Sequence, residues 1–115
     1  MASGKIEMYT EKQYELETLK DKINTELDRL SIEFKDEIVR ELGETKTLLL
    51  IYERWYLRTS SYASLVIMLS EFKGYQCADI IATGGKDNFF SLGAETNFLK
   101  CGEDALQKIG FLRKM

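Results

Sequence analysis

The 115-residue sequence contains no histidine and no proline, and it has only two cysteines. Without histidine, the chain cannot carry a Ser–His or Cys–His nucleophile pair, histidine-based acid–base catalysis or most kinds of catalytic zinc site. The absence of proline fits continuous regular structure with few rigid turns. Cys77 and Cys101 are too few for a disulfide framework or a zinc site, so we expect both to be reduced and to pack as small hydrophobic residues.

Long apolar runs are also missing. No stretch of about 18 apolar residues could span a membrane, and residues 1–12 lack the apolar segment of a secretory signal, so we expect a cytoplasmic protein without a membrane span. Residues 1–44 hold seven Lys/Arg against twelve Asp/Glu, and residues 45–115 hold nine against seven. Because an acidic half repels phosphate backbones, we expect no nucleic-acid partner. No spacing typical of a metal or cofactor site is present, and we expect neither.

The first half of the chain predicts an acidic, mostly helical segment at about residues 10–42. Thr10–Gln13 has the form of a capping box, which would start a helix at this point. The apolar residues that follow have a helical spacing: Leu16, Leu19, Ile23, Leu27 and Leu30. Before the box, Ile6 and Met8 alternate with charged residues, which is a weak signal for a short strand or an arm.

Residues 30–42 fit two structures. As a helix they would extend the apolar stripe to a C-cap at Gly43, but the whole helix would then be roughly 48 Å long, which is more than a domain of this size spans. As a strand, most of their apolar residues fall on one side, and Gly43-Glu44 would turn the chain into the next strand. The length argument favours a break near Ser31, while the state of 32–42 stays open.

The stretch from Thr45 to Gly85 predicts three strands, at residues 47–58, 63–72 and 75–83. Polar turns separate them, including Lys73-Gly74, and such short connections imply an antiparallel meander. The first two strands are apolar on both faces. Helices would cover one face, and the simplest cover for the other is a partner subunit, because a one-sided antiparallel sheet should alternate cleanly between apolar and polar residues.

After a loop that begins at Gly84-Gly85, the sequence predicts a short strand at Phe89–Leu92 and a closing helix at about residues 94–112. The apolar stripe of this helix contains Phe98, Cys101, Ala105, Ile109 and Leu112. Gly102 interrupts it and predicts a kink or a close packing contact. We therefore expect residues 1–115 to form one α+β domain, with an antiparallel meander sheet of four to five strands at about residues 45–92 and both helices packed on one face.

Glu53, Arg54 and Arg58 are the unusual residues of a strand otherwise suited to burial. Strand geometry places Glu53 and Arg54 on opposite faces, so they cannot pair directly. Glu53, if buried, needs a donor and could line a binding pocket or act as a general acid, although a structural ion pair or an exposed edge position is the commoner explanation. Arg54, between Tyr52 and Tyr56, could stack on their rings or contact an anion.

The Gly84-Gly85-Lys86 loop superficially resembles a phosphate-binding loop, but it lacks the spacing of a P-loop and is expected to be a turn. Ser60, Ser61 and Ser64 have no histidine or suitably spaced lysine to activate them, so we assign no catalytic residue. The candidate binding residues are Glu53, Arg54, Tyr56, Arg58, Gly84 and Gly85.

The run from Tyr52 to Arg58, with Ala63-Ser64-Leu65 after it, resembles the E-[KR]-[YF]-Y-x-R and A-S-L signature of a family of small uncharacterised Gram-positive bacterial proteins. Gly84-Gly85 and Gly93-Ala94-Glu95 with Phe98 resemble the second block of that signature. This chain departs from the pattern at Trp55, Tyr62 and Leu92, and the change at Tyr62 weakens an anion site. The resemblance covers residues 46–100. It supports the fold and supplies no activity, because the family is a domain of unknown function.

Together these patterns favour a non-enzymatic binding or interaction module that forms a homodimer through its second apolar face. The alternative is a small-ligand sensor or a carboxylate-based enzyme with a pocket around Glu53–Arg58. A third hypothesis is a coiled-coil partner protein, which would require residues 11–42 to form one long helix.

Overall fold

The computed structural model describes residues 3–56, 61–84 and 94–114. These residues form one sheet and two helices. In chain order the elements are β1 (Ser3–Thr10), α1 (Leu16–Asp28), β2 (Glu33–Leu42), β3 (Thr45–Tyr56), β4 (Ser61–Phe72), β5 (Tyr75–Gly84), α2 (Ala94–Ile109) and β6 (Leu112–Arg113). The short strand predicted at Phe89–Leu92 lies outside the described residues.

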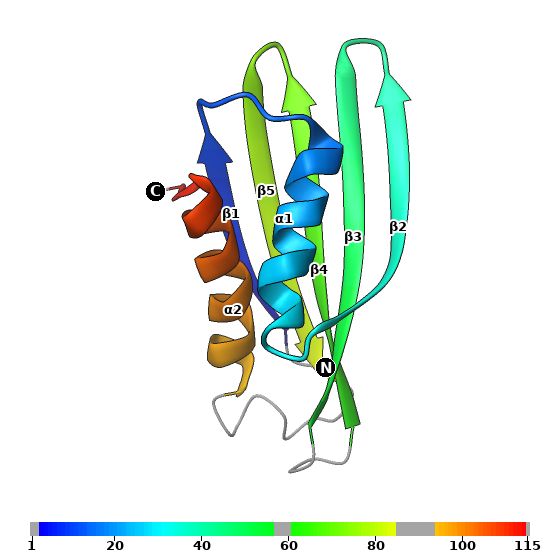
Figure 1. Ribbon diagram of the computed structural model, residues 1–115, viewed down its shortest axis with the longest axis vertical. Helices are drawn as coiled ribbons and strands as arrows, with labels where there is room; N and C mark the ends of the chain where they lie inside the picture. The colour runs from blue at the N-terminus through cyan, green and yellow to red at the C-terminus, as the bar shows by residue number, and fades with distance from the viewer. Residues whose placement is uncertain (1–2, 57–60, 85–93, 115) are drawn as a thin grey trace.

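The sheet has the strand order β2-β3-β4-β5-β1-β6, and every neighbouring pair is antiparallel. The predicted α+β class and the antiparallel meander from β3 to β5 are confirmed. The predicted count of four to five strands is wrong, because six strands pair. β1 adds to β5 at the far side of the meander, and β6 adds two residues beyond β1. The connection through α1 carries the chain from β1 across the sheet to the opposite edge at β2 (Figure 1).

Two tight turns close the meander as the sequence predicts. Gly43 has a φ of 58°, so its lack of a side chain lets β2 turn directly into β3. Lys73 and Gly74 both have positive φ, at 46° and 85°, which is what a type I′ hairpin between β4 and β5 requires. These turns fix the register, and with it which side chains share a face.

The predicted capping box at Thr10 is wrong. Thr10 is the last residue of β1, and its hydroxyl oxygen accepts a hydrogen bond from the Lys12 amide at 3.2 Å, while α1 begins only at Leu16. The buried Gln76 side chain holds the intervening linker: it accepts from the Tyr14 amide at 3.2 Å and donates to the Tyr14 carbonyl at 2.6 Å. Pairing of Thr10 with Gln76 in the sheet therefore overrides the local helix signal.

Both helices end in a Schellman motif. Ser31 adopts a left-handed φ of 61°, its amide bonds to the Asp28 carbonyl, and the Ile32 amide bonds to the Leu27 carbonyl. Ile32 and Leu27 are both buried, as the hydrophobic contact of this motif requires. The chain therefore breaks at Ser31 and continues as β2, which resolves the ambiguous stretch. The helical segment expected at residues 10–42 extends only over α1, and the long helix of the coiled-coil hypothesis is wrong.

α2 closes in the same way, with Gly110 in the left-handed position at a φ of 119° and the Phe111 amide bonded to the Leu106 carbonyl. The Tyr14 hydroxyl donates to the Ile109 carbonyl at 2.7 Å and satisfies another group at this helix end. The predicted closing helix is thus three residues too long. Leu112, expected on its apolar stripe, is exposed and lies in β6.

Both helices pack on the same face of the sheet (Figure 1). Tyr52 of β3, fully buried, donates its hydroxyl hydrogen to Asn24 of α1 at 2.5 Å. A Cβ built on Gly102 of α2 would approach the Ile80 and Leu65 side chains to 3.1 and 3.5 Å, so the predicted close packing contact is present. The four buried residues of α1 are the first four of the predicted apolar stripe. The fifth predicted residue, Leu30, lies past the helix end and is exposed.

No helix of the described residues is long and apolar enough to cross a membrane.

β2 is the exposed edge of the sheet. Its residues are exposed except for Glu37, which is half-buried and forms an ion pair with Lys20 of α1. Lys20 also lies over the Phe34 ring, 5.1 Å from its centre, and the hydrogen bond from Lys20 to Glu37 raises the pKa of Lys20. These contacts attach the edge strand to the helix layer.

We expect Ser31→Gly to stabilise the protein by about 0.5–1 kcal/mol, because glycine adopts the left-handed conformation without the steric cost that serine carries there. Urea unfolding measures the change, and Ser31→Ala, which keeps the Cβ, is the matched control. A stability of Ser31→Gly equal to or below that of Ser31→Ala would contradict this account of the helix end.

Burial raises the pKa of Tyr52, with a further contribution from the charge of Glu37. The folded state therefore favours the neutral phenol. The stability that this phenol adds to the fold is fully present below pH 10 and is lost as the pH rises further. Wild type should exceed Tyr52→Phe in stability at pH 9, and the difference should shrink by about 1 kcal/mol at pH 11. A constant difference for Tyr52→Phe would show that the phenol titrates normally.

Candidate functional site on the open face of the sheet

The face of the sheet opposite the helices carries exposed and half-buried apolar side chains. Along β5, buried residues such as Ala78 and Ile80 alternate with exposed ones such as Cys77 and Ile81. The buried set packs under α1 and α2, so the other set points away from them. We call this second side the open face, and the side that carries the helices the helix face.

Apolar side chains form the centre of the open face in two neighbouring cross-strand rows. One row runs from Ile81 through Val66 to Ile51, and the next runs from Met68 through Leu49 to Ile38. Ile38 and Ile81 are exposed, at 43% and 39%, and the other four are half-buried by their neighbours within the sheet. We call these six residues the apolar patch.

Aromatic side chains extend the patch toward both ends of the strands. At one end, Trp55 and Tyr62 form an edge-to-face pair with ring centres 5.0 Å apart, and about half of each side chain is exposed. At the other end, Phe72 and Tyr75 lie opposite each other across the β4–β5 hairpin, and both are exposed. Exposed aromatic residues beside an apolar centre are typical of protein interfaces.

Charged residues lie at both sides of the patch. On β1, Lys5 extends the row of Ile81, and Glu7 extends the row of Met68 through Asp79. On β2, Asp36 lies in the row of Lys5, at the other end. Arg40 lies two rows further along β2, in the row that holds Cys77. The open face therefore has an apolar centre with acidic and basic residues on both outer strands.

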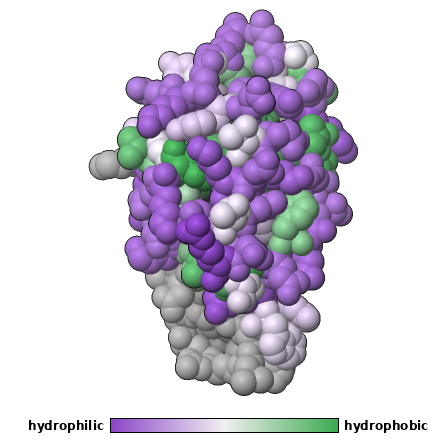
Figure 2. Space-filling view, viewed as in Figure 1, coloured by the Kyte–Doolittle hydropathy of each residue, from purple (hydrophilic) through white to green (hydrophobic). Residues whose placement is uncertain are grey.

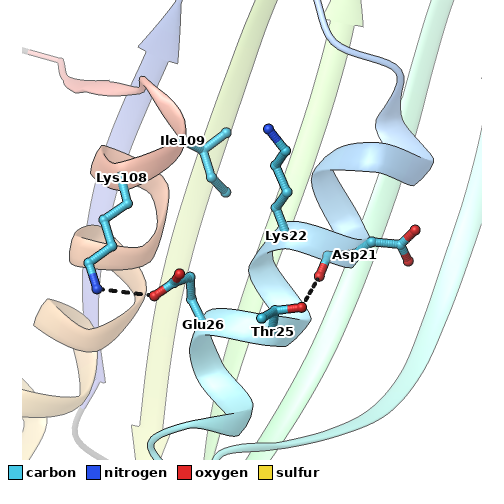
Figure 3. A pocket seen from close by; sticks show the side chains of 6 residues that line it. All are labelled: Asp21, Lys22, Thr25, Glu26, Lys108 and Ile109. Carbon is cyan, nitrogen blue, oxygen red and sulfur yellow. Dashed lines mark hydrogen bonds and ion pairs between the residues drawn. The ribbon is translucent and has the colours of Figure 1, made fainter.

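By contrast, the side that carries the helices is mostly hydrophilic (Figure 2). A shallow groove of about 320 Å³ lies between α1 and α2, and a hydrogen-bonded ion pair between Lys108 and Glu26, 3.1 Å long, crosses it (Figure 3). Lys22 and Asp21 also line the groove, so its charges balance among themselves. Such a lining offers no net charge to attract an ionic ligand.

The predicted site residue Glu53 lies on the open face, opposite Ser64 on β4 and Glu33 on β2. It is half-buried, so it does not have to be paired or protonated as a fully buried carboxylate would. Lys35, at the bulge in β2, binds Glu33 at 3.0 Å. The pKa of Lys35 is raised by this hydrogen bond and further by the charges of Glu33 and Glu53.

Arg54 and Gly84 lie on the helix face, in one row with Ala63 between them. The Arg54 charge acts on the Cys101 thiol of α2, whose pKa is nonetheless raised because burial dominates. The backbone of Tyr56 pairs with Ser61, and its side chain lies outside what the structure describes, as do Arg58 and Gly85. The described members of the predicted pocket are therefore divided between the two faces, as the alternation of Glu53 and Arg54 predicts.

The sequence did not single out Ile38, Lys5 or Asp36 as members of the site. Ile38 and Asp36 lie in the stretch whose state was open, and their face follows only from the bulge between Phe34 and Asp36, which shifts the register. Lys5 belongs to a strand that the sequence signalled only weakly. The sequence feature that predicts the apolar patch is the presence of apolar residues on both faces of the strands at residues 47–58 and 63–72.

The fold and this surface define a class of protein: an α+β domain with one antiparallel sheet, both helices on one face, and an apolar second face. The model of a family of unknown function, DUF6054, matches residues 1–110, and the chain belongs to this family. The expected membership of an uncharacterised family is consistent with this match.

Comparison with curated proteins gives no match. Among solved structures, the vertebrate conserved region of human METTL16 is 11% identical, with 86% of this chain and 79% of that chain covered and a TM-score of 0.47. The protein TTHA0849 from Thermus thermophilus is 12% identical, with 95% and 99% covered and a TM-score of 0.29. At these scores neither structure informs the function of this chain.

We expect Glu53→Gln to change the free energy of unfolding by less than about 0.5 kcal/mol, because removing this half-exposed charge loses the attraction of Lys35 and also relieves the repulsion of Glu33. Urea unfolding measures the change, with Glu41→Gln on the exposed edge strand as the control. A gain above about 1.5 kcal/mol would instead show that Glu53 is a strained carboxylate of the kind found in active sites.

Proposed function

We propose that this protein is a non-enzymatic interaction module that self-associates through its open face. The observation that carries this proposal is the apolar patch, which no helix of the described residues covers. An antiparallel sheet with one solvated face normally alternates between apolar and polar residues, but β3 and β4 present Leu49, Ile51, Val66 and Met68 on the side away from the helices. A monomer in water would leave this apolar surface exposed.

The size of the open face suits a stable contact between two copies. Five strands spaced about 4.8 Å apart, each about ten residues long at ~3.3 Å per residue, cover about 800 Å². A typical stable interface buries about 800 Å² on each partner. Two such sheets packed face to face, with the helices outside, would form a sandwich of four layers.

The chemistry of the face also suits a second copy as the occupant. Each copy offers the same apolar centre, and Lys5 and Arg40 on the outer strands can meet Glu7 and Asp36 of a partner. A face that holds both signs of charge around an apolar centre is complementary to itself, which a two-fold symmetric contact requires.

The small-ligand sensor or carboxylate-based enzyme receives less support from the geometry, because Glu53 and Arg54 lie on opposite faces and cannot line one pocket together.

We expect light scattering on wild type at micromolar concentration to give twice the 13.3 kDa chain mass. Met68→Lys should weaken the association at least about 100-fold, since an unpaired lysine at the centre of an apolar interface costs ~3 kcal/mol or more. Thr18→Lys adds the same charge on the exposed side of α1 and should leave the dimer intact. A wild-type protein that stays monomeric, or a Met68→Lys protein as dimeric as Thr18→Lys, would refute the proposal.

A further inference from the structure

The order of charges along the two outer strands contains information about how two copies would pack. β1 carries Lys5 and then Glu7 on the open face, whereas β2, which runs in the same direction, carries Asp36 and then Arg40. The signs are therefore opposite in order. Within one chain these strands are four positions apart in the sheet, roughly 19 Å, so Lys5 and Asp36 cannot pair with each other.

We propose that two copies pack face to face about a two-fold axis that runs along β4, so that β1 of each copy lies over β2 of the other. β4 is the central strand of the five long ones, with β2 and β1 equally far on either side. Such an axis keeps every cross-strand row at its own level. Lys5 then faces Asp36 of the partner subunit. This arrangement rests on the proposed self-association and adds the geometry of the contact.

The same axis joins the apolar patches. Val66 and Met68 lie on β4 itself and contact their own copies across the axis, while Ile51 faces the partner subunit's Ile81 in the same row. In the next row Met68 contacts its own copy, and Glu7 lies opposite the partner subunit's Ile38.

A two-fold axis across the strands would pair the charges differently. Centred on the row of Lys5, it places Lys5 on Lys5 and Asp36 on Asp36; centred on the next row, it places Glu7 on Glu7 and Asp79 on Asp79. Centred between these rows, it pairs Lys5 with Glu7 and leaves Asp36 opposite Ile38, whereas the axis along β4 pairs Lys5 with Asp36 and leaves Glu7 opposite Ile38. The two axes therefore differ in which carboxylate Lys5 meets.

Single-cysteine crosslinking distinguishes the two axes. Ser64 and Ser70 both lie on the open side of β4, about 20 Å apart along the strand. In a background in which Cys77→Ala and Cys101→Ala remove the native thiols, Ser64→Cys and Ser70→Cys should each crosslink to its own copy with a short bismaleimide, because every residue of β4 lies near the axis. Thr18→Cys, on the exposed side of α1, measures crosslinking by random collision and should give several-fold less dimer.

An axis across the strands can pass near only one of these two positions. If one variant or neither crosslinks above the Thr18→Cys level while light scattering shows a dimer, the axis is wrong and the proposed self-association stands. If light scattering shows a monomer, the self-association itself is wrong.

A charge exchange gives an independent readout on the full chain. Lys5→Glu alone and Asp36→Lys alone should each weaken the dimer, since each places like charges opposite one another across the interface. The double variant restores the pair with its signs exchanged, so its dissociation constant should return to within about threefold of wild type. Additive losses in the double variant, measured by sedimentation equilibrium, would overturn the proposed axis.

Discussion

The packing of both helices against one face of a single sheet is the constraint on which the rest of the structure depends. α1 crosses the sheet from β1 to β2, and α2 packs beside it, so alternate residues of every central strand enter one core that includes Tyr52, Leu65 and Ile80. The same alternation turns the other residues away from the helices. A polar second face would complete an ordinary two-layer domain. Here Ile51, Val66 and their neighbours occupy it, and neither helix of the described residues covers them.

Hydrogen bonds at the ends of the helices and in the linker before α1 hold the elements of that core in position. Schellman motifs at Ser31 and Gly110 end both helices, and each motif buries the residue that follows, Ile32 or Phe111. The Gln76 side chain binds both backbone groups of Tyr14, and the Tyr14 hydroxyl binds the end of α2. These few polar contacts connect β5, the linker and both helices.

Much of this fold could be predicted from the sequence, because the strands from residue 45 to 83 combine apolar runs with turn residues such as Lys73-Gly74. The start of α1 could not be predicted. Thr10 has the local sequence pattern of a helix cap, but its pairing with Gln76 in the sheet outweighs this preference. The state of residues 32–42 depended on whether Ser31 would take a left-handed conformation, which serine does only under tertiary constraint. The uncovered apolar face was predictable from its two-sided strands, whereas its charged borders needed the register of β1 and β2.

The central claim is that the open face is covered in solution by a second copy. Trp55, the only tryptophan, lies on this face and is 48% exposed in the single chain. The most direct measurement is its fluorescence emission over a dilution series from micromolar to nanomolar concentration. The account predicts a blue-shifted maximum at high concentration that moves to the red on dilution, with a midpoint that matches the dissociation constant from sedimentation. An emission maximum typical of exposed tryptophan at every concentration would contradict it.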